Sequence, residues 1–284
     1  MQSWYNNRLI DEEKAVVSIF DRSYLYGEGV FETLRCYKGR PAFVDRHFKR
    51  LKANLNRLEI QIPFDEKGFE NILLALCEAN KIKEAAVRIT ISLVGASFGV
   101  GRPKEAKVNV SAFCRPVTID PKNFQNGVKV WPSALLLNDS PATANIKSTS
   151  YLIKMLARRE AEENNAYETI LKNQKGFWVE GSRTNLFILI DQTVITAPLS
   201  DGLLSGITRE VVLEILKKQN IPHREDQITA AMLKNAEEIF LTGSTSEVMP
   251  VCEVMGVWKN KVPVNSLASQ LQRQYREKRS LLGG

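Results

Sequence analysis

The chain has 284 residues, of which 44% are apolar and 25% are charged, as is typical of a folded globular protein. At about 150 residues per domain, this length indicates two domains. The longest apolar run has six residues, Ile72–Cys77, whereas a membrane-spanning helix needs about 20. The first residues lack the apolar segment of a secretory signal, so we expect a soluble, cytoplasmic protein.

The net charge of +7 comes from 39 Lys and Arg against 32 Asp and Glu. Nucleic-acid-binding proteins concentrate their positive charge, but no long block of like charges occurs here. The densest cluster, Arg273–Arg279, includes Glu277 and is typical of the solvated face of a terminal helix. We therefore expect no nucleic-acid or membrane partner, and the charge better suits small anions such as phosphates and carboxylates.

The cysteines and histidines disfavour several kinds of site. The four cysteines are widely spaced and form no Cys-x-x-Cys pair, so neither a zinc site nor a disulfide framework is indicated. The only histidines, His47 and His223, lack metal-ligand spacing, and we expect no metal. A Ser-His-Asp hydrolase is therefore poorly supported. The glycine motifs that bind dinucleotides or nucleoside triphosphates are absent from the sequence.

Hydrophobic periodicity predicts alternating strands and helices in the first half of the chain. One helix carries a stripe of Phe48, Leu51, Leu55 and Leu58, and we expect Asp45 to cap it. In chain order, the predicted elements are a strand at Lys14–Phe20, helices at Asp45–Leu58 and Phe64–Ala79, and strands at Ala86–Leu93 and Lys107–Cys114.

The segment Arg115–Asn123 contains two prolines and little periodicity, which is typical of a linker. We expect an N-terminal α/β domain at 1–114, a linker at 115–127 and a C-terminal α/β domain at 128–284. The elements predicted after the linker are helices at Ser150–Glu163, Ile207–Gln219 and Asn265–Lys278, and strands at Glu168–Lys172, Phe177–Val179, Leu186–Ile190, Val194–Thr196 and Glu238–Leu241. The fold class is therefore α+β, and a cleft between the two domains is the expected ligand site.

Two turns in the second half could bind an anion. The segment Leu203–Glu210 turns through Gly206 into a helix, whose first amides and positive dipole end attract phosphate. The alternative is ordinary capping by Ser205 or Thr208. In the other turn, Thr242–Glu247 follows a buried strand and contains four hydroxyl residues around one glycine. The alternative there is a plain polar turn.

Two side chains could complete a site with these turns. Lys147 lies among small hydroxyl residues just before a helix, and a desolvated lysine can form a Schiff base, although any one lysine is far more often a surface residue. Glu180 lies where one apolar strand turns toward another, so it needs a cationic partner. That partner is either a neighbour such as Arg183 or the protonated ring nitrogen of a cofactor. An amine, two phosphate cradles and such a carboxylate together suit pyridoxal 5′-phosphate.

With these parts in order, the chain resembles the class IV aminotransferases, the fold type IV group of pyridoxal-phosphate enzymes. This group includes branched-chain aminotransferases, D-amino-acid aminotransferases and aminodeoxychorismate lyases. The resemblance covers nearly the whole chain and is carried by six stretches: Leu25–Arg35, His47–Leu51, Ile146–Lys147, Glu180–Phe187, Gly206–Arg209 and Gly243–Glu247.

The resemblance implies a role for each cofactor-binding residue. Lys147 would carry the internal aldimine and move the proton between the substrate Cα and the cofactor, and Glu180 would pair with the pyridinium nitrogen. Arg50 would bind the phosphate, and Tyr151 would hydrogen-bond the phenolic oxygen, although it follows Lys147 one residue sooner than in branched-chain enzymes. The remainder of the phosphate cup would come from four residues: Ile207, Thr208, Ser244 and Thr245.

Substrate-binding residues follow from the same resemblance. Tyr26 and Phe31 would line the pocket, although aromatic residues at strand ends are more often part of a core. Arg88 is a candidate for the substrate carboxylate, with an exposed sheet arginine as the alternative. Arg102 is its rival, as in some lyases and D-specific members.

The implied reaction moves the amino group of an aliphatic, branched-chain-like amino acid to a 2-oxo acid such as 2-oxoglutarate, with ping-pong kinetics. The alternatives are a D-amino-acid aminotransferase or relaxed specificity for both, and then aminodeoxychorismate lyase. A hypothesis of another class is a cofactor-binding protein without turnover. Family members are homodimers or larger, so we expect the same here.

Overall fold

The computed structural model describes residues 1–96 and 99–280. The chain forms two compact units. Unit 1 comprises Met1–Thr118 together with Ile146–Tyr151, and unit 2 comprises Ile119–Asn145 together with the described residues from Leu152 onward. Within the described ranges, no helix is long and apolar enough to span a membrane. The division into domains with a linker at 115–127 and the cytoplasmic location stay predictions.

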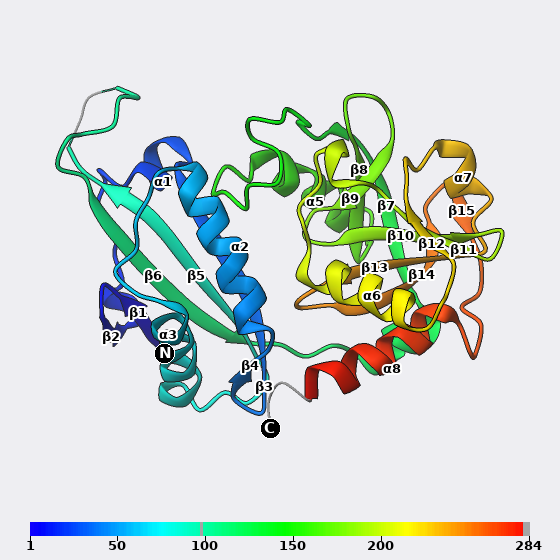
Figure 1. Cartoon of the computed structure of the whole chain (residues 1–284), viewed down its shortest axis with the longest axis horizontal. Helices are drawn as coiled ribbons and strands as arrows, with labels where there is room; N and C mark the ends of the chain where they lie inside the picture. The colour runs from blue at the N-terminus through cyan, green and yellow to red at the C-terminus, as the bar shows by residue number, and fades with distance from the viewer. Residues whose placement is uncertain (97–98, 281–284) are drawn as a thin grey trace. The chain divides into compact units, whose positions relative to one another are not determined.

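Unit 1 is built on a six-stranded antiparallel sheet with the strand order β2-β1-β6-β5-β3-β4 (Figure 1). The long central strands pair along almost their whole length, so the sheet has one continuous core face. The strands are β1 (Gln2–Tyr5), β2 (Arg8–Asp11), β3 (Gly29–Tyr37), β4 (Arg40–Pro41), β5 (Ala85–Val94) and β6 (Lys107–Pro116).

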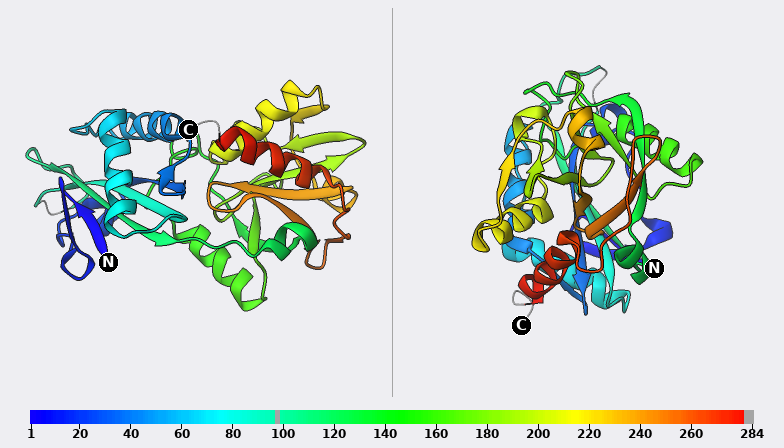
Figure 2. Two further views of the ribbon diagram at one scale, coloured as in Figure 1. Left: turned by 90° about the horizontal axis from the view of Figure 1, so that it is seen from below. Right: turned by 90° about the vertical axis from the view of Figure 1, so that its right-hand side faces the viewer.

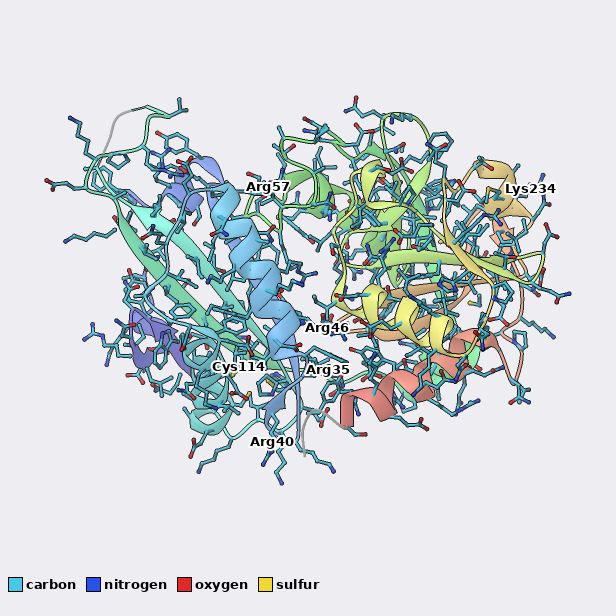
Figure 3. All side chains as sticks on the ribbon, in the orientation of Figure 1. Arg35, Arg40, Arg46, Arg57, Cys114 and Lys234 are labelled. Carbon is cyan, nitrogen blue, oxygen red and sulfur yellow. The ribbon has the colours of Figure 1, made fainter. Side chains whose placement is uncertain are left out.

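Two amphipathic helices, α2 (Val44–Arg57) and α3 (Glu66–Ala79), cover one face of this sheet. In Figure 1, α2 runs along the sheet, and in Figure 3 Arg46 and Arg57 mark its two ends. The core between the helices and the sheet is apolar and fully buried, and Leu51 and Phe69 both have no exposed surface. A short helix, α1 (Arg22–Tyr26), precedes β3 and ends at Gly27, whose left-handed backbone favours glycine.

Side-chain alternation gives β3 two different faces. Val30, Glu32 and Leu34 are buried, and Val30 and Leu34 belong to the core beneath the helices. Phe31 and Thr33 lie on the other face of the strand, since successive side chains point to opposite sides. The strand therefore presents a carboxylate to α2 and an aromatic ring to the opposite side.

The segment 146–151 belongs to unit 1 because it adds an extra pairing to the start of β3. Ser148 forms an antiparallel bridge with Val30. The Phe31 amide donates to the Lys147 carbonyl at 2.9 Å, and the Thr149 amide donates to the Gly29 carbonyl at 2.9 Å. These backbone bonds fix the position of Lys147 beside β3, independently of its side chain.

Unit 2 contains a larger, mixed sheet with the order β12-β11-β10-β13-β14-β7-β8-β9. Its green-to-orange strands are seen from two further sides in Figure 2. A further pairing of β9 with β10 joins Glu180 to Asn185, so this path closes on itself. The strands are β7 (Val128–Leu136), β8 (Glu168–Lys172), β9 (Trp178–Gly181), β10 (Asn185–Ile190), β11 (Thr193–Thr196), β12 (His223–Glu225), β13 (Glu238–Gly243), β14 (Glu247–Val254) and β15 (Trp258–Lys259).

The α-helices in the described part of unit 2 are α4 (Pro121–Asn126), α5 (Leu152–Glu163), α6 (Ile207–Lys218), α7 (Ala230–Lys234) and α8 (Leu267–Ser280). The last of them is joined to the sheet through Glu247, which is 1% exposed. This carboxylate accepts hydrogen bonds from Gln272, from Arg276 Nε at 2.9 Å and from Arg279 Nη1 at 2.6 Å.

Two predictions from the sequence are wrong. Lys14–Phe20 is not a strand: a 3₁₀ turn at Glu12–Lys14 is followed by irregular chain. Val16 and Ile19 are 70% and 68% exposed, so their apolar side chains do not enter the core. The helix over 45–58 is confirmed, but its N-cap is Phe43 in a left-handed conformation and not Asp45. The other predicted elements are confirmed, with ends that differ by at most two residues.

Replacing Glu247 by Ala should loosen α8. The change leaves the donors of α8 without their buried acceptor, and we expect the free energy of unfolding to fall by about 1–3 kcal/mol. Glu162→Ala is the matched control, because that carboxylate is 58% exposed and pairs along its own helix with Arg158; its loss should be about 0.5 kcal/mol or less. Urea unfolding followed by circular dichroism measures both, and equal losses would contradict the anchoring role.

Candidate functional site

Three of the predicted site residues gather in unit 1 around the ring of a fourth, Phe31. The Lys147 Nζ lies 4.5 Å from the ring centroid, and the Arg88 Cζ lies 3.6 Å from it. Tyr151 meets the same ring edge-on, with 5.5 Å between centroids. Both cations face the negative face of the ring, which favours positive charge. The result is an amine, a guanidinium and a phenol around one aromatic wall.

Arg88 is not the exposed sheet arginine of the alternative interpretation. It is half-buried, and its Nε donates to Thr90 Oγ1 at 3.4 Å. Burial lowers the pKa of Arg88, while the nearby Tyr151 acts in the opposite direction. A partly desolvated guanidinium beside a ring is suited to receive a carboxylate. Its role toward a substrate stays a prediction.

Arg50 is held by a buried carboxylate on β3. Its Nε donates to Glu32 Oε1 at 2.8 Å and its Nη2 donates to Glu32 Oε2 at 2.7 Å, a two-pronged pair that fixes the plane of the guanidinium. His47, one turn earlier on α2, bonds to the same Oε2 through Nδ1 at 2.7 Å. Glu32 has no exposed surface. Although burial opposes it, the Arg50 charge and these bonds hold the pKa of Glu32 well below its usual range.

Tyr26 and Arg102 belong to a second group in unit 1. The Tyr26 hydroxyl donates to the Gly99 carbonyl at 2.9 Å, and the Arg22 guanidinium lies over its ring. Arg102 and Arg22 both pair with Glu28, and Arg102 Nη2 also donates to the Leu58 carbonyl at 2.7 Å. Two arginines on one carboxylate leave a positive charge in excess. The described contacts of these two residues are therefore with Gly99, Arg22, Glu28 and Leu58, although the neighbouring Gly27 accepts a hydrogen bond from Ser150, next to Tyr151.

Glu180 is the centre of a network within unit 2. It lies on β9 and is 3% exposed. Its Oε1 accepts from Lys154 Nζ at 2.7 Å, while its Oε2 accepts from the Leu204 amide at 3.1 Å and the Asn185 amide group at 3.4 Å. The predicted alternative partner, Arg183, instead pairs with Glu168 at 3.6 Å, so that alternative is wrong.

The start of α6 adjoins this network. Gly206 occupies its N-cap, so neither Ser205 nor Thr208 holds that position. A Cβ at Gly206 would lie 1.9 Å from Asn185 Oδ1, so this close approach requires glycine. Ile207 and Thr208 form the first turn and are buried, and their amides are among those that have no partner within a helix.

Ser244 and Thr245 lie in the turn between β13 and β14. The residue before this turn's glycine, Thr242, pairs directly with Asn185 on β10. The turn therefore lies at the same end of the sheet as the Glu180 network. Unit 2 thus brings Glu180, the start of α6 and this turn to one end of its sheet; the cofactor-binding roles expected for them stay predictions.

The sequence did not predict four residues that organise these groups. Glu32 and His47 lie within family motifs, but nothing in the sequence indicated their pairing with Arg50. Lys154 could not be singled out either, because a lysine in the first turn of a helix is ordinary. Glu168 also went unpredicted: it has no exposed surface and accepts from Ser182 Oγ at 2.6 Å. Buried carboxylates on strands gave the one usable signal, because each must have a donor or cation nearby.

Comparison with known proteins decides the family. The amino-transferase class IV family model matches residues 29–254, which is most of the chain. The chain belongs to this family. It is therefore a class IV aminotransferase, and the resemblance drawn from its motifs is confirmed. The shared stretch spans every predicted cofactor-binding residue from Arg50 to Thr245.

Relatives with two kinds of name are about equally similar. The chain is 30% identical over 284 residues to a putative branched-chain-amino-acid aminotransferase of Methanocaldococcus jannaschii, covering 100% of this chain and 98% of the relative. It is also 30% identical over 261 residues to a D-alanine aminotransferase of Bacillus licheniformis, covering 90% of this chain and 89% of the relative. The comparison alone does not separate these two substrates.

Solved structures agree on the fold, so the predicted fold type IV architecture is confirmed. A branched-chain aminotransferase from Thermoproteus uzoniensis with norvaline has a TM-score of 0.88 and 28% identity, covering 100% of this chain and 95% of that one. A 4-amino-4-deoxychorismate lyase from Pseudomonas aeruginosa has a TM-score of 0.83 and 27% identity, covering 97% and 98%. A branched-chain amino acid aminotransferase crystallised with pyridoxamine 5′-phosphate has a TM-score of 0.88 and 24% identity, covering 99% and 94%.

The protonation of His47 tests the Glu32 cluster. Burial lowers the pKa of His47, and the charges of Arg50 and Lys147 lower it further, although Glu32 opposes them. We therefore expect a neutral imidazole in the folded protein below its ordinary pKa of about 6.5, with the proton on Nδ1 facing Glu32. As the pH falls, the imidazole of His47 takes up a second proton in the unfolded chain before it does so in the folded chain. His47 therefore lowers the free energy of unfolding as the pH falls below about 6.5.

Histidine-selective ¹⁵N NMR measures this directly, because the chain has only two histidines. The His223→Gln variant leaves one signal, which assigns His47. We expect that signal to show the Nδ1–H tautomer at neutral pH. A His47 signal that titrates at or above about 6.5 would contradict the buried, charge-compensated cluster.

Proposed function

We propose that the protein is a pyridoxal 5′-phosphate-dependent transaminase that moves the amino group of an aliphatic, branched-chain-like amino acid to a 2-oxo acid such as 2-oxoglutarate. The observation that carries this proposal is the group around Phe31, in a chain of the class IV family. Lys147 supplies an amine, Arg88 a carboxylate-binding cation, and Phe31 an apolar wall. An aliphatic amino acid presents the complementary carboxylate and apolar side chain.

The donor set fits pyridoxal 5′-phosphate. Unit 2 supplies a buried carboxylate, Glu180, for a ring nitrogen, and a helix start at Gly206 with the hydroxyl turn at Ser244 and Thr245 for a phosphate. Glycine at position 206 lets that helix start approach Asn185 closely, beside the Glu180 network. When bound, the cofactor supplies the electron sink on which amino-group transfer depends. A structural neighbour holds pyridoxamine 5′-phosphate in a similar fold.

Lys147 is the proposed catalytic residue. Its backbone is fixed by the pairing with β3, so its side chain projects from a rigid position beside Phe31. We infer that Lys147 holds the cofactor and that its amine, once released by the substrate, carries the substrate α-proton. Tyr151 would bind the phenolic oxygen, and Arg50, whose guanidinium is oriented by Glu32, would donate to the phosphate. A cofactor site in the cleft between domains stays part of the proposal.

Substrate binding is assigned to the two arginine groups. Arg88 is the proposed partner of the substrate carboxylate, with Phe31 as the wall of the pocket. Arg102 and Tyr26 are the proposed alternative set, which would favour D-amino acids. Arg102 would first have to release Glu28 and the Leu58 carbonyl, and this supports Arg88 as the better candidate.

The second candidate is a D-amino-acid aminotransferase, supported by relatives as similar as the branched-chain one. Relaxed specificity for both substrates is a natural extension, and aminodeoxychorismate lyase is third. We also propose a homodimer or larger assembly. Val16, Ile19 and Tyr24 lie close together in sequence and are between 68% and 70% exposed, and an apolar run of this kind is typical of an interface.

Replacing Lys147 by Ala should abolish transamination. The variant lacks the amine that moves the α-proton, so we expect turnover to fall by at least about 10³-fold, with the fold intact. Turnover of L-leucine with 2-oxoglutarate is the measurement. Lys49→Ala, an exposed lysine on α2, is the matched control and should leave turnover unchanged. Wild-type-like turnover of Lys147→Ala would refute the assignment.

Visible absorption of the cofactor-loaded protein tests the donor. We expect L-leucine to bleach the band of the bound cofactor and D-alanine to leave it unchanged, because the proposed donor is a branched-chain-like amino acid whose larger apolar side chain would contact the Phe31 wall. Bleaching by D-alanine alone would replace the first candidate by the second. Release of pyruvate from aminodeoxychorismate without an added 2-oxo acid would instead indicate the lyase. Cofactor binding without any of these reactions would indicate a binding protein.

A further inference from the structure

The ion pair between Lys154 and Glu180 is the starting observation. Lys154 is the third residue of α5, and its Nζ donates to Glu180 Oε1 at 2.7 Å. The two side chains are only 17% and 4% exposed. A buried carboxylate is stable as an anion only when a cation or several donors compensate it. In unit 2 that cation is Lys154.

Both oxygens of Glu180 are engaged by the protein itself. While Lys154 takes Oε1, the Leu204 amide and the Asn185 side chain take Oε2. The two groups on Oε2 belong to the framework: one is backbone, and Asn185 is fixed by its pairing with Thr242 and its bond to the Leu204 carbonyl at 2.9 Å. Lys154 differs because it is a flexible four-carbon chain that carries a full charge.

Binding of the cofactor would change this balance of charge, an inference that rests on the proposed function. A protonated cofactor nitrogen that pairs with Glu180 would bring a second cation to a carboxylate that already has one. Two cations near one buried anion repel each other, so each weakens the other's pairing. We propose that Lys154 is a positioning residue that holds Glu180 in the cofactor-free protein and competes with the cofactor ring nitrogen for its charge.

The competition predicts opposite effects on the empty and the loaded protein. Without cofactor, removing Lys154 leaves Glu180 buried without its cation, so the protein should unfold at a lower temperature. With cofactor, the ring nitrogen has Glu180 to itself, so its proton and the cofactor should both be held more tightly. A lysine that serves only the packing of α5 would weaken both states together.

The experiment compares two ligands that differ only at the ring nitrogen. Pyridoxamine 5′-phosphate is suitable because it forms no covalent bond with Lys147, and its carbocyclic analogue carries C–H in place of the nitrogen. Dissociation constants are measured by calorimetry for the full-length cofactor-free protein and for Lys154→Met, with Lys154→Gln as a second variant in case the first does not fold. Lys154→Arg restores the charge. Lys259→Met, which removes an exposed lysine paired with Glu253 at 3.4 Å, is the matched control.

We expect the preference for pyridoxamine 5′-phosphate over the analogue to rise about tenfold in Lys154→Met and Lys154→Gln, as for a ring-nitrogen pKa raised by about one unit. It should stay unchanged in Lys154→Arg and Lys259→Met. The ¹⁵N shift of the labelled ring nitrogen should move toward the protonated form in the same two variants. An unchanged preference, with both ligands weakened equally, would overturn the proposal. Failure of the wild-type protein to bind pyridoxamine 5′-phosphate at all would refute the proposed function, and this proposal with it.

Discussion

Charge compensation of buried carboxylates is the constraint on which both units depend. A carboxylate removed from water must be paired or hydrogen-bonded, or it gives up its charge. In unit 1, Glu32 on β3 meets this requirement with His47 and Arg50 of α2. In unit 2, Glu180 meets it with Lys154 of α5, and Glu247 with the arginines of α8. Each of these pairs joins a strand to a helix, so the same contacts that keep the charge also fix the packing.

Because side chains alternate along a strand, β3 places the compensated carboxylate and the candidate site residues on opposite faces of the sheet. On β3, Glu32 faces α2 while its neighbour Phe31 faces the other side of the sheet, where Lys147 and Arg88 meet its ring. A shift of one residue in the register of β3 would exchange these faces and bury the aromatic ring where the carboxylate now lies. The pairing of β3 with β5 over eight residues therefore fixes the face on which Phe31 lies, as well as the core on the other face.

Much of the fold could be predicted from the sequence, because long amphipathic helices and alternating strands carry their pattern in their own residues. The helix over 45–58 and the strand over 86–93 are such elements. The prediction of a strand at Lys14–Phe20 was wrong because apolar residues alone do not show which element, if any, will cover them. Here the apolar side chains of this segment are exposed to solvent. The strand β1 escaped prediction because it has only four residues, one of them buried, and β7 because its partners β14 and β8 are distant in sequence.

The site shows the same division. Lys147, Glu180 and the turn at Gly206 could be proposed because each belongs to a motif with a chemical reason for its residue types. Their partners could not, because a lysine such as Lys154 gains meaning only from the carboxylate that the fold brings to it. The sequence could state that Glu180 needs a cation, but it offered Arg183, its neighbour along the chain. In the structure, Glu180 pairs with Lys154, which lies 26 positions away on another element, and Arg183 pairs with Glu168.

This choice bears on how the family's chemistry is adjusted in one member. The position of Glu180, the proposed partner of a cofactor nitrogen, is set by β9, but its charge is also compensated by the groups that other elements bring to it. Because Lys154 approaches from a helix and not from the strand, it can vary without disturbing the pairing of β9 with β8 and β10. In the proposed function, a single helical side chain would therefore adjust the electron demand of the ring while the strands that hold Glu180 stay constant.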